Sequence, residues 1–361
     1  MKLAAASEAR PGTAGTARLV LRLSSLGDLV LCSAFARALR EEAPDARLFF
    51  WVDASLVPLV ENFGAGFECL PFARGPASLA RAFAQGWRLR RRLGAEGLRL
   101  EHVYDLHGVG KSAALRAGLR LADVFSTRWM RFRSHRTRKS SLLRSLSVLF
   151  RRDLLGARHV YREHLGLLGR DDLRPSLVLA APVARAPRSI LIAPDASKWK
   201  KKWPVEHWSE FLRRLLADPR AFTLTLVGPP KAFPTDLVDE LAALGGERFR
   251  DRLGQTRLDE LPAIAAAHAL TLCGNSAWLH ISEAVGTPVL ALAGPIVPGF
   301  GFSPWRAESR ELGVPLPCRP CTRHGGGPCT YPERHACMKR VSPGRLWEAF
   351  EGWWTRYGDS R

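Results

Sequence analysis

The stretch of sequence that decides the fold is residues 270–292, LTLCGNSAWLHISEAVGTPVLAL. An apolar run over 270–273 predicts a strand, and helical spacing of the apolar residues predicts a helix over 278–285. A second apolar run over 288–292 predicts another strand. Strands that are apolar throughout are typical of parallel sheets covered by helices on both faces, so this segment predicts a βαβ unit.

The same alternation of strand and helix extends outward from this unit. The further strands are expected at 19–23, 48–52, 67–70, 102–106, 189–193 and 222–227. The helices are expected after Asp28, at 55–62, at 79–93, from Lys111, from Pro204 to about 217, and at 258–267. We therefore predict an α/β protein with two Rossmann-like, doubly wound domains.

The domain boundary is expected at residues 181–188, APVARAPR, which are rich in Pro and Ala and lack periodicity. The first domain would span 1–180 and the second 189–340. The aromatic segment 341–361 predicts a closing helix that packs back on the first domain. Ligands of such sheets bind at the carboxyl ends of the strands, so we expect the site in a cleft between the domains.

The charge of this 361-residue chain restricts its partners. Lys and Arg number 54 against 34 Asp and Glu, which gives a net charge of +20. Such an excess suits nucleic acid, a phospholipid surface or a phosphorylated ligand, although a GC-rich coding sequence also contributes arginine. No helix-turn-helix, RRM or zinc-finger pattern supports a nucleic-acid partner.

Residues 124–152 hold nine basic residues and no acidic one. They form either a solvated loop or a surface that docks on an anionic membrane or acceptor. The N-terminus has no apolar run long enough for a signal peptide, so we expect a cytoplasmic chain with reduced thiols.

Three predicted strand-to-helix turns carry the candidate chemistry. In the first, SSLGD at 24–28, Gly27 allows a ligand close to the backbone, and Asp28 is either a helix N-cap or a general base. In the second, 194–204, four lysines beside a helix N-terminus suit a pyrophosphate, or simply form a solvated basic loop. In the third, 274–280, Ser276 can cap a helix, and His280 is either a core residue or a donor to a phosphate.

An ordered set of motifs resembles glycosyltransferase family 9, the ADP-heptose:lipopolysaccharide heptosyltransferases. The motifs are LRLSSLGD at 21–28, VYDLHG at 103–108, KKWPVEHW at 201–208, and residues 274–288 with Gly294 and Pro295. The resemblance implies a GT-B fold, in which the first domain handles the acceptor and the second binds the nucleotide-sugar.

The resemblance also implies roles for individual residues. Asp28 falls on the family's base, and Ser24, Ser25 and Gly27 belong to its acceptor loop. The nucleotide-sugar would be bound by Ser197, Lys201, Gly228, Asn275, Ser276, Ala277 and His280. Asn275 replaces the family's acid, Ala277 its glycine, and Asp195 a further glycine; Asp236 is a candidate for its ribose-binding acid.

The implied reaction is inverting, metal-independent transfer of heptose from ADP-heptose to the inner core of lipopolysaccharide, at the inner face of the cytoplasmic membrane. No cofactor is expected to be required. Two alternatives stay open: a glycosyltransferase of the same fold that uses another nucleotide-sugar for O-antigen or another surface glycan, and a catalytically weakened homologue that only binds nucleotide or glycan.

The late cysteines, Cys318, Cys321, Cys329 and Cys337, form a separate candidate site. Four thiolates at such spacing can hold a structural zinc ion. Free thiols and disulfides are the alternatives.

Overall fold

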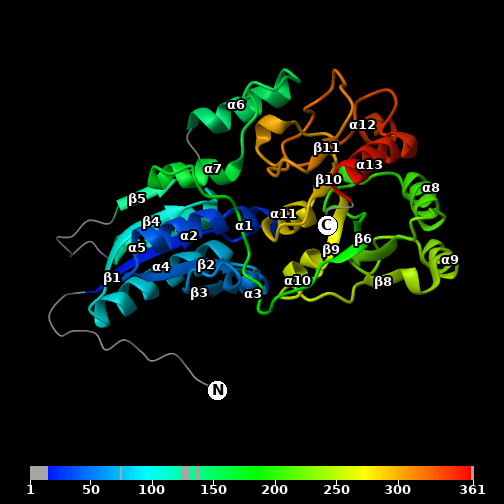
Figure 1. Cartoon of the computed structure of the whole chain (residues 1–361). Helices are drawn as coiled ribbons and strands as arrows, with labels where there is room; N and C mark the ends of the chain where they lie inside the picture. Colours follow the sequence, from blue (N-terminus) through cyan, green and yellow to red (C-terminus); the bar gives the residue numbers. More distant parts are fainter. Residues whose placement is uncertain (1–14, 74, 123–130, 135–137, 359–361) are drawn as a thin grey trace. The chain divides into compact units, whose positions relative to one another are not determined.

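The computed structural model describes residues 15–73, 75–122, 131–134 and 138–358. These residues contain two parallel sheets, one of five strands in the order β3-β2-β1-β4-β5 and one of six in the order β11-β10-β9-β6-β7-β8 (Figure 1). The predicted α/β class with two doubly wound sheets is confirmed. Within the described segments, no helix is both long and apolar enough to cross a bilayer.

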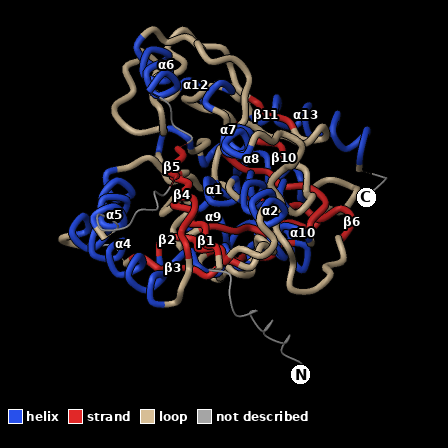
Figure 2. The backbone as a smooth tube through the Cα atoms, turned by 90° about the vertical axis from the view of Figure 1, so that its left-hand side faces the viewer, coloured by secondary structure: helices blue, strands red, loops and turns tan. Residues whose placement is uncertain are grey.

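The first sheet is built from β1 (Thr16–Leu21), β2 (Arg47–Asp53), β3 (Phe67–Phe72), β4 (Arg99–Asp105) and β5 (Arg131–Ser134). Helices α4 (Ser78–Ala95) and α5 (Gly110–Leu121) lie side by side (Figures 1 and 2). A Cβ at Gly86 would lie 2.2 Å from the Leu115 carbonyl oxygen, and one at Gly118 would lie 2.0 Å from that of Phe83. Only glycine at these two positions allows the helix backbones to approach so closely.

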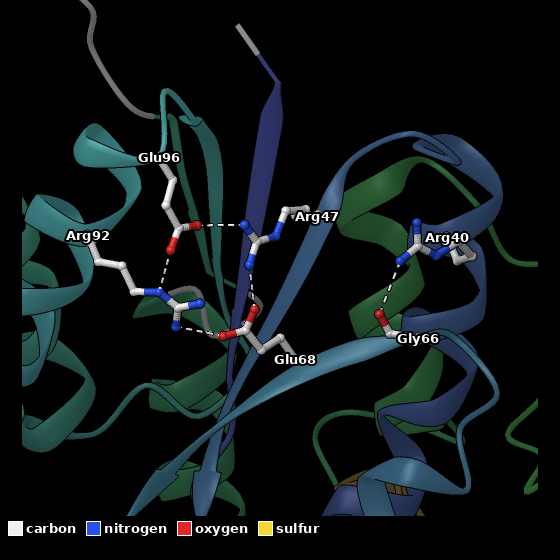
Figure 3. Close-up of polar contacts among 6 residues, drawn as sticks. All are labelled: Arg40, Arg47, Gly66, Glu68, Arg92 and Glu96. Carbon is white, nitrogen blue, oxygen red and sulfur yellow. Dashed lines mark hydrogen bonds and ion pairs between the residues drawn. The ribbon is translucent and has the colours of Figure 1, made fainter. Parts of the chain in front are cut away.

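An ion-pair network ties β2, β3 and α4 together at the surface (Figure 3). The guanidinium groups of Arg47 and Arg92 each pair with both Glu68 and Glu96, at 2.5–2.7 Å. Nearby, Arg40 Nη2 donates to the Gly66 carbonyl oxygen at 3.2 Å. Because the paired side chains are a third or more exposed, each pair contributes little stability alone.

The second sheet consists of β6 (Ala186–Ala193), β7 (Thr223–Gly228), β8 (Phe249–Leu253), β9 (His268–Gly274), β10 (Val289–Leu292) and β11 (Arg310–Leu312). Its helices are α8 (Val205–Leu216), α9 (Thr235–Gly245), α10 (Leu261–Ala266) and α11 (Ala277–Ala284), followed by α12 (Ala336–Lys339) and α13 (Pro343–Tyr357). Every residue of β9 is buried, as its apolar run predicts. The helix expected at 258–267 is shorter, because Pro262 lies in its first turn.

Two of the predictions above are wrong. Strand β6 begins at Ala186, inside the expected linker, because Ala186 N donates to the Ala267 carbonyl oxygen at 2.9 Å and so joins the sheet. The closing helix α13 packs on α8 beside the second sheet, whereas the prediction placed it on the first domain. Its Trp354 ring meets Phe222 at 4.6 Å, so the aromatic face of α13 completes the core of the second sheet.

Contacts divide the chain into two compact units that do not follow chain order. One unit holds the first sheet; the other joins residues 24–39 and 55–65 to 136–361. The second unit therefore includes α1 (Leu26–Leu31), most of α2 (Ser33–Glu42) and α3 (Val57–Glu61), as well as α6 (Arg138–Leu149) and α7 (Val160–Leu165). As a result, Asp28 belongs to the same unit as Lys201 and His280.

Candidate active site

The first site element is the Asp28 carboxylate at the start of α1. Ser25 is the N-cap of this helix, and Asp28 occupies the third helical position, so the reading of Asp28 as the N-cap is wrong. Asp28 Oδ2 accepts a hydrogen bond from Ser25 Oγ at 2.8 Å, and Ser25 N lies at 3.4 Å. This capping box orients a half-buried carboxylate at the beginning of the helix.

Gly27 brings α1 directly against the N-terminal turn of α11. A Cβ at Gly27 would lie 2.9 Å from His280 Cδ2 and 3.3 Å from the Ala277 Cα. The second contact is with backbone, which cannot move aside easily, so a side chain here would separate the helices. Through this contact the Asp28 charge acts on both His280 and Lys201.

His280 is 4 % exposed, and its ring lies parallel to that of Trp305, 5.9 Å away and tilted by only 4°. Among the described residues, its Nδ1 has no hydrogen-bond partner. Burial lowers the pKa of His280 to about 4, although the Asp28 charge acts in the opposite direction. His280 is therefore neutral at pH 7 and offers a phosphate one N–H donor instead of a positive charge.

Lys201 lies in the loop after β6 and contributes its ammonium group to the same site. Its Nζ donates to Asn275 Oδ1 at 2.9 Å, while Asn275 Nδ2 donates to the Phe302 carbonyl oxygen at 3.3 Å. Burial lowers the pKa of Lys201, and the charges of Asp28 and Glu311 oppose this effect. An ionised Asp at position 275 could not donate to Phe302, so asparagine fits this turn in a way that the family's acid does not.

The other lysines of the basic turn point elsewhere. Lys200 is 2 % exposed, and its Nζ donates to the Pro328 carbonyl oxygen at 3.0 Å. Lys202 pairs with Asp195 at 2.5 Å, while Lys198 is exposed. The expectation that four lysines act together on one pyrophosphate is therefore wrong, because a short 3-10 turn over Trp199–Lys201 sends successive side chains in different directions.

The remaining predicted residues belong to the same compact unit. Ser276 is the N-cap residue of α11, as expected, although its side chain makes no capping hydrogen bond. The first N–H groups of α11 lack helical partners, as at every helix N-terminus. Gly228 ends β7 with φ near +154°, and Ser197 is exposed, as is Asp236 in the first turn of α9.

A cavity of about 420 Å³ was not predicted. It lies beyond the carboxyl ends of β6 and β7, and Trp203, Trp208, Phe233, Lys202 and Lys231 are among the residues that line it. The basic turn at 194–204 and the Gly-Pro-Pro turn after β7 were the sequence signals near it.

The four late cysteines are free thiols. Within the described ranges, no set of three or more His, Cys, Asp or Glu side chains is placed to hold a metal ion, so the structure does not assemble the zinc site. Burial raises the pKa of Cys337 to about 11 and also raises that of Cys318. Cys321 Sγ instead lies 3.8 Å from Lys200 Nζ.

Glu283, one turn after His280 on α11, is a site residue that sequence reasoning missed. Its carboxylate accepts hydrogen bonds from Trp305 N at 2.6 Å and Arg306 N at 3.1 Å. Glu283 thus fixes the backbone of Trp305, whose ring stacks on His280. An acidic residue in an otherwise apolar helix was the signal that could have found it.

Glu283→Gln is expected to change how stability depends on pH. Burial raises the pKa of Glu283 from 4.5 to about 7, so between these values the folded state binds more protons than the unfolded state. The free energy of unfolding should therefore fall as pH rises through this window, by roughly 3 kcal/mol from this one group. Glutamine does not titrate, so urea unfolding of the variant should lack this fall.

The comparison of the two proteins at pH 5 and pH 8 isolates Glu283. His280 titrates in the opposite sense at low pH, but it is present in both proteins and cancels in their difference. Parallel stability profiles of wild type and Glu283→Gln would contradict the assignment.

The structure matches the E. coli ADP-heptose lipopolysaccharide heptosyltransferase II with a TM-score of 0.66 and 19% identity, over 94% of this chain and 98% of that one. It matches E. coli heptosyltransferase WaaC, solved with ADP-2-deoxy-2-fluoro heptose, with a TM-score of 0.58 and 15% identity, over 93% and 99%. The fold is thus that of the GT-B glycosyltransferases.

The sequence matches a family model over less than half of the chain. Residues 167–326 match the model of glycosyltransferase family 9 (heptosyltransferase), which confirms the resemblance that the motifs predict. Lipopolysaccharide heptosyltransferase 2 of E. coli K12 is 30% identical over 103 residues. That segment is 28% of this chain and spans only 29% of the relative.

Proposed function

We propose that this chain is an inverting glycosyltransferase that moves heptose from ADP-heptose to the inner core of lipopolysaccharide. One observation carries the proposal: the glycine contact between α1 and α11 brings the Asp28 carboxylate within electrostatic reach of Lys201 and His280. A carboxylate beside a cation and a helix N-terminus supplies both a base and an anion site.

In this reaction Asp28 is the general base. It takes the proton of an acceptor hydroxyl, whose oxygen then attacks the anomeric carbon from the face opposite to the departing ADP. The new C–O bond forms as the bond to the phosphate oxygen breaks, which inverts the configuration. The hydrogen bond from Ser25 Oγ keeps the carboxylate oriented for this transfer. Ser24, Ser25 and Gly27 would form the acceptor loop.

The leaving diphosphate develops negative charge, which Lys201 would stabilise. The N–H groups at Ser276 and Ala277, the neutral His280 ring, Ser197 and the backbone at Gly228 would complete its binding site. Fixed donors aimed at developing charge are among the largest contributions to catalysis. This set needs no metal ion.

Asn275 favours a catalytically active protein over a binding-only homologue. Its amide oxygen accepts from Lys201 and its amide nitrogen donates to Phe302, so the altered motif still positions the lysine. ADP-heptose as donor and the lipopolysaccharide core as acceptor rest on the heptosyltransferase relatives. We place the activity in the cytoplasm, with peripheral contact to the inner membrane face and no nucleic-acid partner.

A thermal-shift panel with ADP, UDP, GDP and CMP tests the donor. We expect ADP alone to raise the melting temperature, because a ligand at 100 times its Kd stabilises the folded state by about 2.7 kcal/mol. Transfer from ADP-heptose to isolated inner core should then be measurable. A preference for UDP or GDP would replace the donor with another nucleotide-sugar, and no response to any nucleotide would reject the proposal.

A further inference from the structure

Exposed apolar side chains gather where α6 ends. Leu142 is 58 % exposed, Leu149 70 %, Phe150 64 % and Leu154 38 %. Single exposed leucines are common on proteins, but four large exposed apolar side chains within 13 residues of the chain, here called the α6 patch, mark a candidate interaction surface. In Figure 1, α6 lies at the outer edge of its unit, beyond α7.

The patch is held in place by buried polar contacts beneath it. Ser147, which is fully buried, accepts from Arg152 N through its carbonyl oxygen at 3.0 Å and from Leu154 N through its hydroxyl at 3.2 Å. Arg144 Nη2 lies 3.0 Å from both oxygens of Glu163, which ties α6 to α7. These contacts fix the backbone of residues 144–154, and the apolar side chains of this segment are left exposed.

The rim of the patch is positive. Arg151 and Arg152 follow Phe150 directly, and both are exposed. The only acidic residue in 138–156 is Asp153. Its carboxylate accepts from Leu155 N at 3.0 Å, Gly156 N at 3.2 Å and Gly299 N at 2.9 Å, so its charge is directed inward.

We propose that this surface, formed by Leu142, Leu149, Phe150, Leu154, Arg151 and Arg152, docks the protein on a bilayer that contains anionic phospholipid. The apolar side chains would enter the boundary between headgroups and acyl chains, while the two guanidinium groups meet lipid phosphates. Charge complementarity favours an anionic bilayer as the partner. Its phosphate headgroups match the two arginines, and the acyl chains beneath the headgroups match the exposed leucine and phenylalanine side chains. The inference deepens the proposed function, since it rests on a membrane-embedded acceptor.

Flotation with lipid vesicles tests the surface. The full chain should bind phosphatidylglycerol–phosphatidylcholine vesicles, bind less as salt rises, and not bind phosphatidylcholine alone. The double substitution Leu149→Ser with Phe150→Ser should lower binding about tenfold or more, and each of Arg151→Glu and Arg152→Glu at least about fivefold. Leu244→Ser, which removes a leucine of 49 % exposure on α9, is the matched control and should change nothing.

The outcomes separate this inference from the proposed function, because vesicle binding needs neither donor nor acceptor. Unchanged melting temperatures show that the variants fold, and full transfer to a delipidated, water-soluble core shows that the active site is intact. Wild-type vesicle binding by the Leu149→Ser, Phe150→Ser variant would overturn the assignment. So would concentration-dependent self-association without lipid that the same variant abolishes, since the patch would then bind a second copy.

Discussion

Asp28→Asn is expected to lower the rate of heptosyl transfer by about 10²–10⁴-fold, the range that a positioned general base contributes. Asparagine has the shape of aspartate, and its carbonyl oxygen can still accept from Ser25 Oγ, so the helix start should survive. It cannot take the proton of the acceptor hydroxyl. The loss should therefore appear in kcat, with ADP affinity changed by less than about threefold, because the base acts on the acceptor.

Two further variants complete the measurement on Asp28. Asp45→Asn alters an exposed acid between α2 and β2 and should leave transfer unchanged. Ser25→Ala removes the hydroxyl that orients the carboxylate and should cause a smaller loss than Asp28→Asn. An Asp28→Asn protein with normal kcat would show that another group takes the proton.

Lys201→Met is expected to weaken ADP binding by about 10–100-fold, since hydrogen bonds to charged groups contribute about 1.5–3 kcal/mol. Methionine keeps the length and apolar stem of the side chain but removes the ammonium group. The transfer rate should fall as well, because in the proposed mechanism Lys201 stabilises the charge of the leaving diphosphate. Calorimetric titration with ADP and single-turnover transfer measure the two effects separately.

Lys198→Met is the matched control for this prediction. Lys198 lies three residues earlier in the same basic turn, and it is exposed. Its substitution should change ADP affinity by less than about threefold. Equal losses in both variants would mean that the turn acts through its total charge, and that Lys201 has no special position.

Much of the fold could be predicted from periodicity. The expected strands at 48–52 and 270–273 lie inside β2 and β9, because residues buried on both faces of a sheet must be apolar throughout. The strand expected at 102–106 overlaps β4, which begins three residues earlier and ends at Asp105. Strand β8 was missed because its sequence, FRDRL, is largely charged and its central residues are exposed at the side of the sheet. The short β11 offers too few residues for any pattern.

The packing of the closing helix could not be predicted. Its aromatic residues predict an amphipathic helix, but they do not say which surface it covers. The second sheet lacked apolar cover beside α8, and α13 buries Phe350, Trp353 and Trp354 there. Which core a helix completes depends on the space that other elements leave, and no local pattern records that space.

By itself, the sequence determined the two parallel sheets, the family resemblance and the three turns that carry the candidate chemistry, because periodicity and turn residues are local properties of the chain. The resemblance singled out Lys201 among the four lysines, and the tertiary structure supplied its partner Asn275, while Lys200 and Lys202 have other partners. Only the tertiary structure showed that Glu283 holds the loop that stacks Trp305 on His280. Neighbouring lysines of one turn point to different partners, and Glu283 contacts Trp305 although 22 residues separate them in the sequence. Packing across the whole unit produces both effects. The sequence therefore supplies the residue types of the site, and the fold determines which of them come into contact.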